Sequence, residues 1–346
     1  MARRTVTQRL DAFQRRHAGA GFPLAVVYKF IDDQGTYLAA LITYYGFLSL
    51  FPLLLLLTSV LGVLLRNNPH LQQQIVESAL SQIPVIGTEL GDPKALGGGV
   101  TAIVLGGLVA LYGALGVANA TQNAMNVIWA VPRNRRPDPI RARLRSLLLL
   151  LTAGIALIGA TILAAIGSRS GSWGASLGWV ISVLLMLAAV VVNATVFLLA
   201  FRISTAMRLT LRQVAPGAIT AAVLWQLLQS FGAQYVSRVV ATASATNSVS
   251  AVVLGLLAFI FLAANILVVT VEINVVRSKR LYPRALMTPF TENVELTGGD
   301  QDVYADAAKA QRYKDIQDVE VSFDGQSAPS QSSRRPRKRG RPPVEK

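Results

Sequence analysis

The chain has 346 residues, of which 52% are hydrophobic and only 15% are charged, yet its formal net charge is +15. Soluble domains carry about 25% charged residues, so this composition excludes an ordinary soluble domain and indicates membrane spans with positive charge concentrated on one side. There is no cysteine, and the two histidines, His17 and His70, lie far apart in the sequence. Disulfides and thiolate chemistry are therefore excluded, and we expect no metal and no cofactor.

Residues 1–38 predict a cytoplasmic basic arm followed by an interfacial helix. Residues 1–21 hold five arginines and few apolar side chains, which fits a solvated arm and a weakly amphipathic interfacial helix equally well. Apolar residues then recur at helical spacing at Leu24, Val27, Tyr28 and Ile31. We expect residues 22–33 to lie along the membrane surface or to pack beneath a helical bundle.

Residues 39–280 predict an all-α transmembrane domain of six helices. The first span, residues 41–65, is uncharged, and at about 1.5 Å per residue it exceeds the ~30 Å hydrocarbon core of a bilayer. Pro52 removes a backbone hydrogen bond there, so neighbouring groups must satisfy the freed carbonyl. Residues 66–99 predict a surface amphipathic helix. The remaining spans are expected at about 100–131, 146–167, 175–200, 214–236 and 249–276.

The lysines and arginines predict the orientation of these spans. With the N-terminus in the cytoplasm, 29 of the 33 basic residues fall in cytoplasmic segments. The four on the opposite side are Arg66, Lys94, Arg169 and Arg238. Positive charge retains loops in the cytoplasm, so the sequence predicts six helices with both termini cytoplasmic.

Polar residues inside the predicted spans are the candidate functional groups. The second span carries Asn119, Gln122, Asn123 and Asn126 on one helical face, which fits interhelical packing and the lining of a hydrated cavity equally well. The first span adds Tyr44 and Tyr45, which are either interfacial anchors or part of that path. The other polar positions considered for the same path are Gln226, Asn265 and Asn274, together with the helix-breaking Pro52.

Glu272 is the only acidic residue within a predicted span. A carboxylate at membrane depth is costly and is either partnered or functional. One interpretation is a structural group that accepts hydrogen bonds from asparagine or tyrosine on a neighbouring helix. The other is a direct part in transport or proton coupling.

Residues 281–346 predict a disordered cytoplasmic tail with a basic end. The segment Arg337, Lys338, Arg339, Gly340, Arg341 and Pro342 is similar to an AT-hook, whose extended Arg-Gly-Arg core enters the narrow minor groove of A·T-rich DNA. The alternative is a polybasic segment that binds anionic lipid.

Four stretches together carry a family resemblance. They are YYGFLSLFPLLLLLTSVLG at 44–62, TQNAMNVIWAVP at 121–132 before an arginine-rich loop, APGAITAAVLWQLLQSFGAQYV at 215–236, and VEIN at 271–274. In order and spacing they resemble the YihY/virulence factor BrkB family of bacterial inner-membrane proteins, once called ribonuclease BN. The resemblance covers roughly residues 22–283 and implies six helices with cytoplasmic ends.

These observations favour a multi-pass protein of the bacterial cytoplasmic membrane with a transporter- or permease-like role. The alternative is a non-transporting anchor or scaffold whose basic tail binds DNA or anionic lipid. We do not expect an enzyme, a ribonuclease included, because no Ser-His-acid set, two-metal acidic cluster or phosphate-binding GxxxxGK[ST] motif is present. The expected partners are membrane lipids, and a homo-oligomer is an open alternative. The sequence specifies neither a substrate nor a coupling ion.

Overall fold

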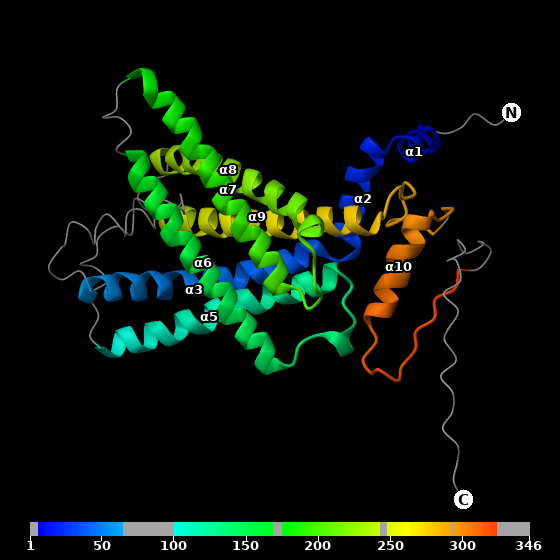
Figure 1. Ribbon diagram of the computed structural model, residues 1–346, viewed down its shortest axis with the longest axis horizontal. Coiled ribbons are helices and arrows are strands. Elements are labelled where there is room, and N and C mark those ends of the chain that lie inside the picture. The colour runs from blue at the N-terminus through cyan, green and yellow to red at the C-terminus, as the bar shows by residue number, and fades with distance from the viewer. Residues whose placement is uncertain (1–5, 65–99, 169–174, 243–247, 293, 324–346) are drawn as a thin grey trace, which may run out of the picture.

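The computed structural model describes residues 6–64, 100–168, 175–242, 248–292 and 294–323. Over these residues the chain forms helices and no strand (Figure 1). In chain order the elements are α1 (Val6–Arg16), α2 (Ala18–Asp32), α3 (Gly35–Leu64), α5 (Val100–Ile128), the short 3-10 helix η1 (Arg133–Arg135), α6 (Pro139–Ser168), α7 (Ala175–Ser204), α8 (Leu211–Thr242), α9 (Ser248–Lys279) and α10 (Gly298–Ala310). The surface helix predicted within residues 66–99 lies outside the described residues.

Each of the six predicted spans coincides with a long helix: α3, α5, α6, α7, α8 and α9. Three stretches within the described residues are long and apolar enough to cross a membrane, namely Met186–Ser204, Leu211–Gly232 and Val253–Lys279. Gly35–Leu50 is a shorter apolar helical stretch. The helix α6 begins seven residues before its predicted span, because the arginine-containing segment from Pro139 continues as helix ahead of the apolar run.

The bundle core is formed by α3, α5, α8 and α9, with α7 packed against α8 and α6 against α7. Its buried face is rich in small side chains, including Ala120 and Ala124 on α5 and Ala218 and Ala221 on α8. Such residues let helix backbones approach closely, which is how helices associate in lipid. In Figure 1, α6 and α7 cross the other four long helices obliquely.

Gly217 marks a close approach between the backbones of α8 and α9. A Cβ atom at this position would lie 2.2 Å from the carbonyl oxygen of Thr270 on α9. The N–H of Gly217 donates to Asn274 Oδ1 at 2.7 Å. The preceding residue, Pro216, has no backbone N–H to donate within the helix. Glycine therefore places α8 directly against α9.

Residues 281–292 and 294–323 correct the prediction of a disordered tail from Leu281 onward. They form an ordered cap that includes α10, and α10 begins with a capping box between Thr297 and Asp300. The composition predicted disorder because it is acidic and poor in apolar residues, but the cap is held by partners far away in the sequence, in α1 and α2. Residues 324–346 lie outside the described residues.

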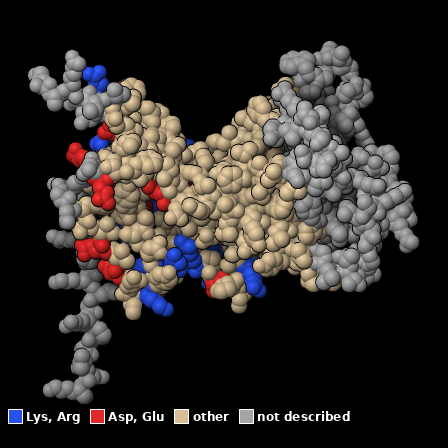
Figure 2. Space-filling model, turned by 180° about the vertical axis from the view of Figure 1, so that it is seen from behind, with Lys and Arg blue, Asp and Glu red and all other residues tan. Residues whose placement is uncertain are grey.

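The N-terminal helices and the cap gather at one end of the bundle (Figure 1). The view from behind shows acidic and basic side chains concentrated at this end, whereas most of the described surface of the bundle is uncharged (Figure 2). We call this end, with α1, α2 and residues 281–323, the base.

Candidate functional site: a buried ion cluster at the base

Three ionisable side chains meet where α2 packs against α9. Lys29 on α2 lies with its Nζ atom 3.8 Å from Glu272 Oε2 on α9. The same ammonium group forms an ion pair with Asp33, one helical turn along the chain, and donates to the carbonyl oxygen of Ile128 at 3.2 Å. The side chains of Lys29 and Glu272 are 4% and 0% exposed. We call Lys29, Asp33 and Glu272 the base cluster.

The turn between α2 and α3 positions two members of this cluster. Lys29 and Asp33 are four residues apart, so they share one face of the helix end. Gln34 then adopts a left-handed conformation with φ of 56°. Gly35 begins α3 and lies against the ring of Phe30, because a Cβ atom at Gly35 would be 2.3 Å from Phe30 Cδ2. The ammonium group also sits at the carboxyl end of α5, where the helix dipole favours a cation.

Burial perturbs both members of the cluster on the α2 side. Burial disfavours the charged form of Lys29, but the nearby carboxylates of Glu272 and Asp33 outweigh it, so the pKa of Lys29 is raised. The pKa of Asp33 is also raised, because burial of its carboxyl group exceeds the opposing effect of Lys29.

The base cluster holds one cation and two carboxyl groups. With both carboxyl groups ionised, neither oxygen of Glu272 has a hydrogen-bond donor among the described residues. Lys29 lies beside both carboxyl groups, so a single positive charge faces two carboxyl groups in the same buried site. A proton on one of the two would neutralise the buried excess of negative charge. The arrangement is therefore suited to binding and releasing one proton.

A second buried network joins the base cluster to the cap. Arg284 is fully buried and forms ion pairs with Asp300 of α10 and with Asp32 of α2, the latter at 2.9 Å. Its guanidinium group also lies 5.7 Å from the ring centre of Tyr304. Burial raises the pKa of Asp32, and Arg284 only partly offsets that effect. Because Asp32 and Asp33 are adjacent, Arg284 connects the cap to the residue next to the base cluster.

Further contacts fasten the cap to the ends of α5 and α9. Lys279 on α9 pairs with Asp306 on α10 at 2.7 Å and donates to the carbonyl oxygen of Trp129 at 3.2 Å. In the connection after α5, Asn134 donates to Asp315 at 2.6 Å, and Arg133 lies over the ring of Tyr313. The cap thus bridges the helices that carry the base cluster.

A family comparison covers most of this architecture. The family model described as virulence factor BrkB matches residues 26–293. The chain belongs to the virulence factor BrkB family. The matched range includes Lys29, Asp33, Glu272 and Arg284 and ends before Asp300. Neither the search of curated proteins nor the search of solved structures found a match.

In this member of the BrkB family the polar residues predicted on one face of α5 make separate contacts. Gln122 is buried and donates to Ser146 Oγ and to the carbonyl oxygen of Ala142 on α6, at 2.8 and 3.1 Å. Asn126 is buried and accepts from the N–H of Ala206, between α7 and α8, at 2.9 Å. Asn123 accepts from Arg136 at 3.4 Å, and Asn119 is exposed. Gln122 and Asn126 therefore serve helix packing.

The other residues predicted to line a polar path are also dispersed. Asn274 faces Gly217 on α8, and Asn265 donates to the carbonyl oxygen of Phe261 within its own helix. Gln226 is half-buried on α8, and α3 continues as helix through Pro52. Tyr44 is 60% exposed, whereas Tyr45 packs against the core. Among the predicted residues, only Glu272 belongs to the base cluster.

Sequence reasoning missed the partners of Glu272. One of its two interpretations placed asparagine or tyrosine beside this carboxyl group, but the structure supplies Lys29 and Asp33 from a segment about 240 residues earlier. The available signal was Lys29, followed at helical spacing by Asp32 and Asp33, within the otherwise apolar residues 22–33. The AT-hook-like residues 337–342 lie outside the described residues.

Proposed function

We propose that this protein is a multi-pass protein of the bacterial cytoplasmic membrane with a transporter-like role, and that the base cluster closes its cytoplasmic side. Six spans with both ends in the cytoplasm are supported by the six long helices and by the distribution of basic residues. Membership of the BrkB family and the three strongly apolar helices support a membrane location.

The observation that carries this proposal is the complete burial of Glu272 beside Lys29 and Asp33. A static ion pair in a packed interface is stable when each charged oxygen has a donor. Here two carboxyl groups share one lysine, and the oxygens of Glu272 lack donors among the described residues. Intramembrane ionisable groups with such partners mark proton relays and substrate paths.

The chemistry of the base cluster provides two states. When a proton is shared between Asp33 and Glu272, one positive and one negative charge remain, and α2 is held against α9. When that proton leaves, two carboxylates face each other across the contact between α2 and α9, and one lysine must balance both. Proton release therefore favours separation of α2 from α9, and proton binding favours closure.

Site-directed labelling tests this proposal, because the chain contains no cysteine that would give a background signal. Val268 is buried on α9 one turn before Glu272, and a V268C variant reports opening of the base. In inverted membrane vesicles a membrane-impermeant maleimide should label V268C faster as the pH rises. An R277C variant, at an exposed position on α9, should be labelled at all pH values and serves as the control.

Substitutions in the base cluster, made in the V268C background, should change the rate of labelling in opposite directions. E272Q and, separately, D33N remove one of the facing charges, so labelling should be slow and independent of pH. K29M leaves two carboxyl groups without their cation and should accelerate labelling. Labelling of V268C that is unaffected by pH and by all three substitutions would contradict the proposal and favour a static anchor.

A further inference from the structure

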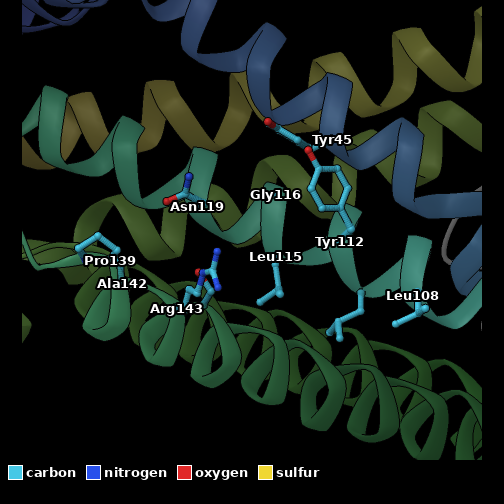
Figure 3. Close-up of a pocket in the computed structure, with 11 residues that line it drawn as sticks. Tyr45, Leu108, Tyr112, Leu115, Gly116, Asn119, Pro139, Ala142 and Arg143 are labelled. Atoms are coloured by element: carbon cyan, nitrogen blue, oxygen red, sulfur yellow. The ribbon is translucent and has the colours of Figure 1, made fainter.

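A groove runs along the outer side of α5, between Tyr45 of α3 and the first turns of α6 (Figure 3). Its volume is about 520 Å³. The residues used below are Leu108, Leu111, Tyr112, Asn119, Arg143 and Ser146, all of which line it. None of them belongs to the base cluster, so the groove is a separate feature of the molecule.

The groove is polar at one end and apolar at the other. Figure 3 shows Asn119 and Arg143 at one end and Leu108 at the other. Asn119 and Leu108 are eleven residues apart on α5, which at 1.5 Å per residue corresponds to ~16 Å. This length matches one leaflet of a ~30 Å hydrocarbon core. Arg143 lies just before the apolar run of α6, at the level expected for the headgroups.

The groove opens outward, away from the core of the bundle. Leu108 and Tyr112 on its rim are 59% and 64% exposed, and Leu147 and Leu148 on the neighbouring helix α6 are also exposed. The hydrogen bonds from Gln122 to Ser146 and Ala142 hold α6 against α5 at the polar end. Gly116 lets the ring of Tyr45 pack directly against α5, because a Cβ atom at Gly116 would lie 2.2 Å from Tyr45 Cδ1. This contact forms the inner wall of the groove.

The polar end carries an available positive charge. Arg141 pairs with Asp138 at 3.3 Å, and Arg145 donates to the carbonyl oxygen of Thr205 at 3.4 Å. Arg143 borders the groove and forms no ion pair with any of the described residues. An arginine above an apolar groove of leaflet length is complementary to an anionic headgroup joined to an acyl chain.

We propose that this groove binds one anionic phospholipid of the cytoplasmic leaflet, with its phosphate at Arg143 and one acyl chain along Leu115, Leu111 and Leu108. The inference rests on the proposed membrane orientation but not on the transporter-like role. Asn119 and Ser146 supply hydrogen-bonding groups beside the phosphate, and Tyr112 covers the chain.

Native mass spectrometry of the full-length protein, with phosphatidylglycerol and phosphatidylcholine of identical acyl chains, tests the inference. The wild-type protein should retain one phosphatidylglycerol in preference to phosphatidylcholine. R143Q should reduce phosphatidylglycerol retention about fivefold, from ~1 kcal/mol per basic residue near a headgroup. L111W, which fills the groove, should reduce retention of both lipids. R277Q removes an exposed arginine outside the groove and should match the wild type.

Equal retention in R143Q and R277Q would overturn the assignment of the headgroup, and unchanged retention in L111W would overturn the groove itself. Lipid retention is measured separately from V268C labelling. Failure of the transporter proposal and failure of the lipid site are therefore distinguishable, because R143Q should leave the pH dependence of V268C labelling intact.

Discussion

At the residue scale, the central feature is a lysine that stabilises two carboxyl groups in a buried site. Lys29 contacts both Asp33 and Glu272, and it also binds the carbonyl end of α5. Replacing it leaves negative charge buried without a partner, which is the costliest way to break a buried ion pair. The stability of the base should therefore depend on Lys29 more than on either carboxyl group alone.

K29M should lower the free energy of unfolding by roughly 3 kcal/mol, because it leaves two buried carboxyl groups unpaired. The double variant K29M/E272Q should recover part of the loss, since it also removes one of those charges. Chemical unfolding in detergent measures both variants. K309M, at an exposed position on α10, is the control. A K29M protein as stable as K309M would show that the ion pairs carry no stability.

The raised pKa of Asp33 predicts how stability varies with pH. Its ordinary value is 3.8, and burial raises it in the folded protein. At pH values between the ordinary pKa of Asp33 and its raised pKa in the folded protein, the folded state binds more protons than the unfolded state. The free energy of unfolding therefore falls as the pH rises above about 4. Lys29 acts in a different window: its raised pKa contributes stability that is fully present below about pH 10.5 and is lost above it. D33N should flatten the decline that begins near pH 4, and unfolding measured from pH 4 upward checks this. An identical slope in D33N and the wild type would contradict it.

At the element scale, close helix approach determines the packing of α8 on α9. Gly217 and Asn274 form one contact: the glycine allows the approach, and the asparagine accepts the N–H of Gly217. Together they explain why a span that contains Pro216 remains a packed helix in the bundle.

G217A should destabilise the protein by about 1–3 kcal/mol, the usual cost of inserting an atom into a packed interface. The added Cβ would collide with the backbone oxygen of Thr270, which cannot move without shifting α9. G154A on α6 is the matched control, because no atom lies within 4 Å of a Cβ placed there. Thermal unfolding in detergent compares the two variants. Equal melting temperatures would show that α8 can move away at little cost.

The helices were largely predictable from sequence, whereas the contacts that define the base were not. Apolar runs and missing charges locate α3 and α5–α9, because a helix that must bury itself in lipid needs about 20 apolar residues. The same logic singles out Glu272 as anomalous. It cannot identify Lys29 as the partner, because no local pattern links α2 to α9. Arg284 and Asp300 were missed for the same reason, since the segment that carries them has the composition of a disordered tail.

At the scale of the whole molecule, the base joins both ends of the described chain to the bundle. Arg284 connects α2 with α10, Asp11 of α1 accepts from the N–H of Leu286, and Tyr28 accepts from the N–H of Met287 at 2.9 Å. These contacts hold the cap against α1 and α2, the latter carrying Lys29 of the base cluster. The cap is therefore expected to stabilise the closed state.

R284Q should release the cap, because it leaves Asp32 and Asp300 without their shared cation. Hydrogen exchange in residues 281–323 should become faster, and V268C labelling should accelerate as the base loosens. K314Q removes an exposed charge within the cap and is the control. If exchange in R284Q matches K314Q, the buried arginine does not hold the cap.

The distribution of basic residues predicts where reporters fused to the chain should lie. A reporter fused after Arg169 should be exported from the cytoplasm, whereas one fused after Arg145 should remain inside. Alkaline phosphatase and green fluorescent protein fusions measure the two locations. A cytoplasmic reporter after Arg169 would invalidate the six-span orientation and the leaflet assigned to the lipid groove.

The interlocking of the two ends has a consequence for biogenesis. Asp32 and Tyr28 emerge from the ribosome early, but their partners Arg284 and Met287 are synthesised more than 250 residues later. At about 5–20 residues per second, the interval is roughly 13–50 s. Throughout that time Asp32 and Tyr28 of the nascent polypeptide lack these partners beside membrane-inserted helices. Premature termination before Arg284 would make this lack of partners permanent, so truncated products should be preferred substrates for membrane proteases.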